Sequence, residues 1–290
     1  MKVVFFGTPK EVVPVLENLT KHFDVIAVVT APDQKSGRKQ LLTLSPIKTF
    51  AQQHNISILQ PENLLNINSQ LTTRNPQLFI VAAYGKLIPN EILQIPQYGA
   101  INIHPSLLPK YRGSTPIQTA LLNGDETSGV TIMKMDEQMD HGPILHQIPF
   151  TLEKTDTFEW LMRSTFEQAA QILPLVIENY VAEKIKPQPQ EDGKATYTKM
   201  ITKQDGYIDL SKQETLNSVE IDRKIRAYYP WPTVWTKWEM PNGQWKIIKF
   251  LPGNKLQVEG KNPVSIEDFF NGYPQMREKF SIILKTTKNK

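Results

Sequence analysis

Short apolar runs alternate with helical patterns through the first 150 residues, and this alternation constrains the fold more than any other feature of the sequence. Residues 2–6 (KVVFF) are too few for a helix and rich in β-branched and aromatic side chains, which predicts a strand buried on both faces. Strand–helix–strand alternation indicates an α/β fold with a mostly parallel sheet covered by helices. Ligands of such sheets bind beyond the carboxyl ends of the strands.

The same reasoning places the other elements along the chain. We expect further strands at residues 25–30, 56–59, 78–83, 100–103, 130–135 and 144–150, and helices at 14–22, 46–54 and 157–183. Ser45 and Pro46 are typical of a helix N-cap and a first helical position. Residues 31–40 are polar and predict a loop.

The composition changes near residue 188. Residues 184–203 are rich in Pro, Gln, Lys and Thr, which is typical of a linker. Beyond them we expect a strand and a helix at 205–229 and aromatic strands at 231–250. The sequence therefore predicts a first domain over 1–187, a linker over 188–204 and a small β-rich domain over 205–290.

Charge is divided unevenly between these parts. Residues 1–187 contain 16 Lys and Arg against 17 Asp and Glu, whereas residues 188–290 contain 17 against 12. A basic C-terminal third is consistent with a polyanionic partner. Ordinary surface lysine explains the same balance, so charge alone does not decide between the two.

Several classes of protein are disfavoured by what the sequence lacks. It contains no cysteine, which excludes disulfides, Cys-ligated zinc and thiol nucleophiles. No apolar run approaches the roughly 18 to 20 residues that span a bilayer. The apolar start is cut short by Gly7 and Pro9, unlike a signal peptide. We expect a soluble cytoplasmic monomer.

The densest polar cluster lies at residues 101–113 (INIHPSLLPKYRG). Asn102 and His104 are two residues apart on a predicted strand, so their side chains leave the same face. Pro105 then stops the strand, which leaves both residues near its carboxyl end. An N-x-H pair at a strand end is also typical of a turn cap, so the spacing alone leaves the function open.

A second polar cluster, residues 135–142 (MDEQMDHG), follows another predicted strand. If the two strands are neighbours, Asp140 can reach His104. An amide donor, an imidazole and a carboxylate suit acyl transfer to an amine: Asn102 would bind the oxyanion and His104 would move the proton. Asp140 would fix the imidazole tautomer and stabilise its protonated form. A solvated loop is the alternative interpretation of this cluster.

The exact strings favour the chemical interpretation. INIHPSLLPKYRG and PIQTALLNGDETSGVTIMKMDEQMDHGPIL resemble the signature of the folate-dependent formyltransferases. The resemblance extends to FFGTP, TAPDQKSGR, LSPIK, LFIVAAYGKLIP and IRAYYPWPTVW, in order over most of the chain. Within the family, the chain looks most like the members that formylate the methionyl ester of initiator tRNA.

This resemblance implies a Rossmann-like catalytic domain and a C-terminal β domain of OB type. It also implies 10-formyltetrahydrofolate as formyl donor, methionyl-initiator tRNA as acceptor and no metal. By motif position, Asn102, His104 and Asp140 match the catalytic trio of the family. The segment that contacts tetrahydrofolate matches Ser106, Leu107, Leu108 and Pro109, with Tyr84 and Gly85 as weaker candidates that an ordinary turn also explains.

Basic residues supply the expected tRNA contacts. The loop at residues 33–42 contains Lys35, Arg38 and Lys39. The resemblance implies that Arg38 helps to hold the acceptor end of the tRNA. In the C-terminal part, the candidate phosphate contacts are Arg223, Lys224, Arg226 and Lys246. We expect most of the aromatic residues there, which are Tyr228, Tyr229, Trp231, Trp235 and Trp238, to be core rather than base-stacking platforms.

One departure from the family pattern keeps alternatives open. Only LPGNKLQVE separates the strand at 246–250 from GKNPVSIEDFFNGY, which is too short for a full OB barrel. A formyltransferase for an amino sugar nucleotide or another small amine, and an RNA-binding module without turnover, therefore remain as alternatives. A nucleotide-dependent dehydrogenase is disfavoured because no G-x-G-x-x-G follows the first strand.

Overall fold

The computed structural model describes all 290 residues except 37–40, 212–216, 241, 279 and 281–290. The chain forms two compact units. The first comprises Met1–Pro116, Ser128–Phe150 and Met162–Thr198, and the second comprises Ile117–Thr127, Thr151–Leu161 and Lys199–Lys290. Residues 188–198, which the composition marks as linker, thus belong to the first unit.

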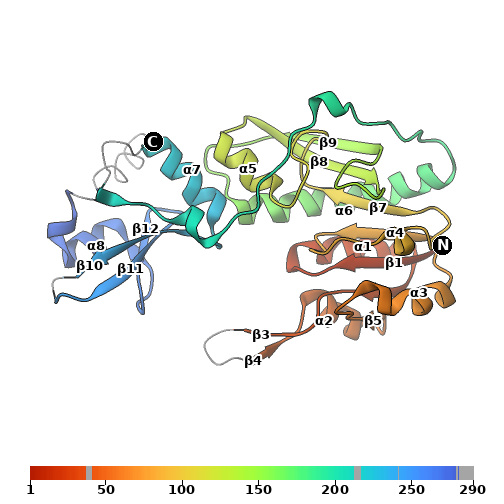
Figure 1. Cartoon of the computed structure of the whole chain (residues 1–290), viewed down its shortest axis with the longest axis horizontal. Coiled ribbons are helices and arrows are strands. Elements are labelled where there is room, and N and C mark those ends of the chain that lie inside the picture. The colour runs from red at the N-terminus through yellow and green to blue at the C-terminus, as the bar shows by residue number, and fades with distance from the viewer. Residues whose placement is uncertain (37–40, 212–216, 241, 279, 281–290) are drawn as a thin grey trace. The chain divides into compact units, whose positions relative to one another are not determined.

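The first unit is built on a seven-stranded sheet in the order β5-β2-β1-β6-β7-β8-β9 (Figure 1). Its strands are β1 (Lys2–Gly7), β2 (Asp24–Val29), β5 (Ser57–Leu59), β6 (Leu78–Ala82), β7 (Ala100–His104), β8 (Thr127–Lys134) and β9 (Ile144–Thr151). The neighbours from β5 to β7 pair in parallel, whereas β7 and β8 are antiparallel. This confirms the mostly parallel α/β sheet.

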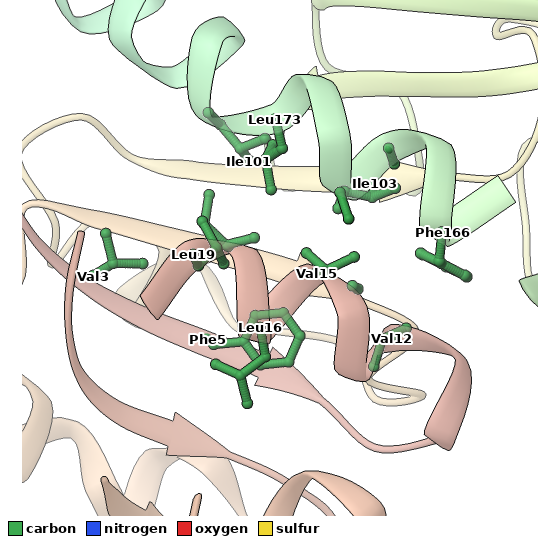
Figure 2. Packing of buried hydrophobic residues seen from close by; sticks show 14 of the residues in the cluster. Val3, Phe5, Val12, Val15, Leu16, Leu19, Ile101, Ile103, Phe166 and Leu173 are labelled. Carbon is green, nitrogen blue, oxygen red and sulfur yellow. The ribbon is translucent and has the colours of Figure 1, made fainter. Parts of the chain in front are cut away.

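Helices cover both faces of this sheet because its strands are apolar on both sides. They are α1 (Val13–His22), α2 (Pro46–Gln53), α3 (Asn68–Arg74), α4 (Asn90–Leu93) and α6 (Phe158–Val181). In β1, Val3 and Phe5 join the core formed with α1, α2 and α6, while Val4 and Phe6 join the core on the side of α3 and α4. Figure 2 shows the first of these cores, with Phe166 of α6 opposite α1.

Helix α2 illustrates how local sequence sets an element's start. The Ser45 hydroxyl oxygen accepts a hydrogen bond from the Lys48 amide at 3.1 Å, which satisfies one of the free N–H groups of the first turn. Pro46 occupies the first turn, where it lacks an N–H that would have no partner. The predicted cap is confirmed.

The polar loop predicted at 31–40 is wrong in part, because a small hairpin projects there. Its strands are β3 (Gln34–Ser36) and β4 (Leu41–Thr43), which pair antiparallel. At the base of the hairpin, Asp33 accepts from Lys48 Nζ at 2.5 Å and from Gln60 Nε2 at 2.8 Å. The sequence of β3, QKS, is wholly polar and has no apolar residues whose alternation would indicate a strand, yet its ladder with β4 still satisfies backbone groups.

The second unit contains a four-stranded antiparallel sheet in the order β10-β11-β12-β13. Its elements are β10 (Val234–Glu239), β11 (Trp245–Leu251), β12 (Lys255–Val258), β13 (Val264–Ser265), α7 (Ser218–Tyr228) and α8 (Ile266–Gly272), together with most of α5 (Pro116–Asn123). The sheet agrees with the reduced β domain expected from the short C-terminal sequence. The strand expected near residue 205 is wrong for the described residues 205–211, where Tyr207 forms only an isolated bridge to Trp235.

Aromatic rings form much of the core of this second unit. Phe280 lies against Phe250, Phe269 and Phe270, with ring centroids 5.6 to 6.2 Å apart. Tyr228 and Trp235 are buried, as predicted. Tyr229 and Trp238 are half-buried, and Trp231, 57% exposed, does not belong to the core.

Candidate active site

Asn102 and His104 project from the end of β7, as the strand period predicts. His104 is 4% exposed and Asn102 is half-buried. The adjacent strand β8 is antiparallel: His104 pairs with Thr131 and Ile101 pairs with Lys134. The loop after β8 therefore begins at the opposite end of β7 from His104 and must fold back to reach it.

That loop, residues 135–143, brings Asp140 to the two strand residues. Asp140 Oδ1 lies 3.5 Å from Asn102 Nδ2 and 3.6 Å from His104 Nδ1. The other carboxylate oxygen, Oδ2, accepts a hydrogen bond from the Gly113 amide at 2.7 Å. The structure thus gathers an amide, an imidazole and a carboxylate around one point, although the two strands are antiparallel rather than parallel.

The tautomer of His104 is set by a backbone carbonyl. His104 Nε2 lies 2.9 Å from the carbonyl oxygen of Tyr111, and a carbonyl can only accept a hydrogen bond. Nε2 therefore carries a hydrogen, and in the neutral ring the lone pair of Nδ1 faces Asp140. We expected Asp140 to fix the tautomer; Tyr111 does so instead.

Backbone geometry of the Asp140 loop is unusual for its residues. Asp140 has φ 49°, in the left-handed region that costs non-glycine residues about 1 kcal/mol. Two residues on, a Cβ on Gly142 would come within 1.9 Å of the Lys134 carbonyl oxygen, so only glycine fits there. The loop passes close to the strand that it leaves.

Of the four residues from 106 to 109 that are expected to contact folate, two are buried within the protein. Ser106 and Leu108 are 1% and 3% exposed, and Thr131 Oγ1 bonds to both backbones, donating to Ser106 O at 2.6 Å and accepting from Leu108 N at 3.1 Å. Leu107 and Pro109 are only half-buried. A ligand can therefore reach the side chains of Leu107 and Pro109 more readily.

Tyr84 and Gly85 lie just beyond the carboxyl end of β6. The Tyr84 ring packs edge-on against Phe6 with centroids 5.5 Å apart, and burial raises the pKa of its hydroxyl to about 12. Among the described residues the Tyr84 hydroxyl has no hydrogen-bond partner, although the side chain is 5% exposed. Gly85 is exposed, with φ 82° and open space where a Cβ would stand.

The basic residues predicted to contact tRNA differ in their burial and in their hydrogen-bond partners. Arg38 and Lys39 lie outside the described residues, and Lys35 belongs to β3. On α7, Arg223 donates to the Asn123 carbonyl at 3.1 Å, while Lys224 is half-buried. Lys246 on β11 is also half-buried.

Arg226, a predicted phosphate contact, is used inside the second unit. Its Nε bonds to Asp222 at 2.8 Å and its NH1 donates to the Asp156 carbonyl at 3.0 Å. The side chain is 13% exposed. These contacts favour a structural role over phosphate binding.

A buried arginine beside the site was missed by the sequence reasoning. Arg112 is 2% exposed and bonds to Gln190, Asp192 and Tyr197, all within a segment that its composition marks as linker. These partners lie 78 to 85 residues away in the chain. Only the INIHPSLLPKYRG string pointed to Arg112, and no local pattern pointed to its partners.

His141, next to Asp140, forms its own ionic contacts. Its Nδ1 lies 2.7 Å from Asp136 and its Nε2 lies 3.5 Å from Asp192. The hydrogen bond that His141 donates to Asp136 raises the pKa of His141, and the hydrogen bond that Arg112 donates to Asp192 lowers the pKa of Asp192. His141 therefore ties the two ends of its loop and does not face His104 in any contact given by the structure.

Metal and membrane features can be stated for the described part of the chain. It contains no group of His, Asp or Glu arranged to hold a metal ion. None of its helices combines the length and apolarity that crossing a bilayer requires.

Comparison with known families adds to this geometry. Residues 1–177 match the family model described as formyl transferase, and residues 200–255 match the formyl transferase C-terminal domain. A methionyl-tRNA formyltransferase of Chloroflexus aurantiacus is 42% identical over 82% of this chain and 76% of its own length. The corresponding protein of Caldicellulosiruptor saccharolyticus is 37% identical over 94% of this chain and 97% of its own length.

Solved structures share the fold at lower identity. A sugar N-formyltransferase from a Shewanella species superposes with a TM-score of 0.65 at 19% identity, covering 87% of this chain and 98% of that one. HypX from Aquifex aeolicus, solved in complex with tetrahydrofolic acid, gives a TM-score of 0.60 at 13% identity and covers 94% of this chain and 47% of that one. At these identities the likeness concerns the fold alone.

Proposed function

This chain belongs to the formyl transferase family, and from that premise we propose that it moves a formyl group from 10-formyltetrahydrofolate to the α-amino group of methionyl-initiator tRNA. The observation that carries the proposal is the breadth of the match. Curated methionyl-tRNA formyltransferases agree with this chain through both family domains, one of them over 97% of its own length. The proposed acceptor places the reaction in the cytoplasm, and we propose that a monomer performs it.

The polar trio supplies the groups that direct transfer between two amines requires. The attacking nitrogen forms a bond to the formyl carbon, and the carbonyl oxygen gains negative charge in the tetrahedral intermediate. Asn102 Nδ2 is the candidate donor to that oxygen, since an aligned donor contributes most where charge develops. Its present neighbour, Asp140 Oδ1, lies at the long distance of 3.5 Å, so the amide is not held tightly by it.

Proton movement falls to His104. Because Nε2 donates to Tyr111, Nδ1 is the nitrogen free to take the proton that the attacking amine loses. Asp140 Oδ1, 3.6 Å away, stabilises the imidazolium that results. The same proton then passes to N10 of the folate as the carbon–nitrogen bond to the donor breaks, so the ring ends as it began.

For the folate, we propose that residues 106–109 form one wall of the site through Leu107 and Pro109, with Ser106 and Leu108 holding the segment in shape. Tyr84 and Gly85 lie at the end of the neighbouring strand β6. The buried Tyr84 hydroxyl, which has no hydrogen-bond partner among the residues that the structure describes, is a ready donor for a polar ligand, because an unsatisfied buried hydroxyl is costly.

For the acceptor, we propose that the basic residues of the segment 33–42, which are Lys35, Arg38 and Lys39, contact phosphates near the reacting end. Arg223 and Lys224 of the second unit are the further candidates for phosphate contacts. Phosphate binding releases counterions, so acceptor affinity should fall steeply as salt rises.

An amino sugar nucleotide is the second candidate acceptor. One observation favours it: the small four-stranded sheet of the second unit. Against it, the agreement with methionyl-tRNA formyltransferases extends through the region matched by the C-terminal family model.

Formyl transfer from 10-formyltetrahydrofolate to three acceptors tests the proposal. We expect product with methionyl-initiator tRNA and none with the uncharged tRNA or with a nucleotide-linked amino sugar. Product on the sugar alone would retain the chemistry and reject the acceptor. The rate with charged tRNA at subsaturating concentration should fall by at least about tenfold between 50 and 200 mM salt if several phosphates are bound.

A further inference from the structure

Residues 188–198, which we call the strap, lie against the first unit on both sides of the site. At one end, Gln188 and Ile144 exchange two backbone hydrogen bonds of 2.8 Å. At the other end, Tyr197 forms a parallel bridge to Arg112. The strap therefore connects β9, which follows the Asp140 loop, with the segment that follows His104.

Between these ends, the side-chain amide of Gln190 bonds to two different parts of the site. Gln190 Oε1 accepts from Arg112 Nε at 3.1 Å and from NH2 at 2.9 Å. Gln190 Nε2 donates to the carbonyl oxygens of Asp140 at 2.9 Å and Gly142 at 2.8 Å. Both hydrogens and both lone pairs of the amide are thus used.

Arg112 determines which way this amide points. A guanidinium group can only donate, and backbone carbonyls can only accept, so the oxygen of Gln190 must face Arg112 and its nitrogen must face the loop. Arg112 is itself held by Asp192 at 2.7 Å and by the Tyr197 hydroxyl at 3.2 Å. A buried guanidinium with these partners is a rigid support, because losing any of them leaves a charged donor without an acceptor.

The Asp140 loop needs support of this kind. It starts at the end of β7 remote from His104 and folds back over the sheet, and Asp140 holds a left-handed backbone. Within the loop, the Asp136–His141 pair closes the turn without fixing its position over β7. Gly113 holds the Asp140 carboxylate, and Gln190 holds the backbone on which that carboxylate is carried.

We propose that Gln190, oriented by Arg112, is a positioning residue that keeps the Asp140 carboxylate beside His104. It acts through Asp140 and does not touch the reacting atoms. The proposal rests on the proposed function for its effect on rate. Its structural content, that Gln190 holds the loop in place, does not depend on which acceptor the enzyme uses.

Gln190→Glu tests the hydrogen-bond donor of the amide separately from its acceptor. The carboxylate still accepts from Arg112, but it cannot donate to the two loop carbonyls and places a negative oxygen against them. Gln188→Glu is the matched control, since Gln188 is exposed and, within the described part of the chain, its side chain bonds only to the Lys186 carbonyl. Gln190→Met, uncharged and of similar length, is the second variant; it removes the donor to the loop and also the acceptor for Arg112, which keeps Asp192 and the Tyr197 hydroxyl as partners.

In steady-state kinetics, we expect Gln190→Glu to lower kcat by about 10- to 100-fold, since displacing a catalytic group by about 1 Å costs roughly that much. KM for the folate and for the acceptor should change less than about threefold, because the Gln190 amide is already bonded to Arg112 and to the two loop carbonyls. Gln188→Glu should remain within about twofold of wild type. A general loss of folded protein would lower kcat equally at every pH, whereas displacement of Asp140 should also change the shape of the pH–rate profile.

Amide hydrogen exchange gives a readout that needs no substrate. The Gly113 amide is protected by Asp140 Oδ2, so its exchange should accelerate at least about tenfold in Gln190→Glu and stay unchanged in Gln188→Glu. Wild-type exchange at Gly113 together with wild-type kcat in the Gln190 variants would overturn the proposal. So would a loss of rate with no change in exchange. If the wild-type enzyme itself does not formylate methionyl-tRNA while exchange at Gly113 accelerates in Gln190→Glu, the positioning role is upheld and the proposed acceptor is rejected.

Discussion

His104 and Asp140 lie side by side in the site, yet the molecule holds them by opposite means. His104 ends a strand in the interior of the seven-stranded sheet, and its neighbour Ile103 is 1% exposed in the apolar core. Asp140 stands on a loop with a left-handed backbone, held by polar contacts from Gly113 and Gln190. The first position is secured by hydrophobic burial and the second by a few hydrogen bonds.

We therefore expect variants on the His104 strand to change mainly the free energy of unfolding, and variants that disturb the Asp140 loop to change mainly kcat. Removing apolar volume near His104 loses buried area and leaves a cavity in the core, which together cost more folding free energy than the loss of a typical single hydrogen bond. Removing one contact to the Asp140 loop costs little folding free energy but misplaces a group on which the rate depends. Variants on each side test whether this separation holds.

The largest effect should come from the two groups themselves. We expect His104→Ala and Asp140→Asn each to lower kcat by about 10³-fold or more, because each removes part of one proton-transfer unit. The double variant should be little worse than either single one, as groups acting together are not additive. His22→Ala and Glu137→Gln, exposed positions with the same chemical changes, serve as controls in single-turnover assays. Small and additive losses would contradict a coupled pair.

The second largest effect on kcat should come from disturbing the hydrogen bond that the Gly113 amide donates to Asp140. At Gly113 the backbone has φ 115°, and an added Cβ would approach Thr198 Oγ1 to 2.4 Å. Gly113→Ala should therefore shift the amide that bonds to Asp140 and lower kcat by about 10²-fold. Gly243→Ala, also at positive φ but in open space, is the control for backbone strain alone. Equal kcat in both variants would show that the Gly113 contact does not position Asp140.

A core substitution on the strand that carries His104 should lower the free energy of unfolding and leave kcat almost unchanged. Ile103→Ala should lower the free energy of unfolding of the first unit by about 2–4 kcal/mol, through lost burial and a residual cavity. Urea titration measures the loss, and kcat assayed well below the unfolding midpoint should stay within about threefold of wild type. A fall in kcat as large as that of Gly113→Ala would remove the distinction between the two sides.

The smallest effect concerns the ionic pair that closes the Asp140 loop. Asp136 raises the pKa of His141 above its usual 6.5, so the pair's contribution to stability is complete below that pH and disappears as pH rises through the raised value. Asp136→Asn should remove this pH dependence and lower Tm by no more than about 3 °C at pH 6. Thermal unfolding at pH 6 and pH 9 measures it. A wild-type Tm that rises between these pH values relative to the variant would contradict the assigned sign.

The two sides also differ in how far the sequence predicts them. The period of two in a β-strand was enough to place Asn102 and His104 on one face at a strand end. For Asp140 the sequence identified the residue but not its route, because it does not reveal that β8 runs antiparallel to β7. Because β8 ends beside the start of β7, the loop reaches His104 by folding back over the sheet and not from the carboxyl edge of the strands.

Long-range polar contacts were beyond prediction for a physical reason. Arg112 and Gln190 are 78 residues apart, and their contact follows from the fold and not from any local pattern. A stretch rich in Pro and Gln has the composition of a linker whether it is free or bonded to the domain. Likewise, Trp231 and Trp235 are only four residues apart in the sequence, but of the two Trp235 is buried and Trp231 is exposed.

The paired use of the Gln190 amide makes an evolutionary prediction. An arginine at 112 without an amide at 190 leaves buried donors unpaired, and an amide at 190 without the arginine loses the group that orients it. Neither residue can change alone without that cost, so natural variants of this chain should replace the two together. Among family members, positions 112 and 190 should therefore covary, and those that have lost both should hold their catalytic carboxylate by a different segment.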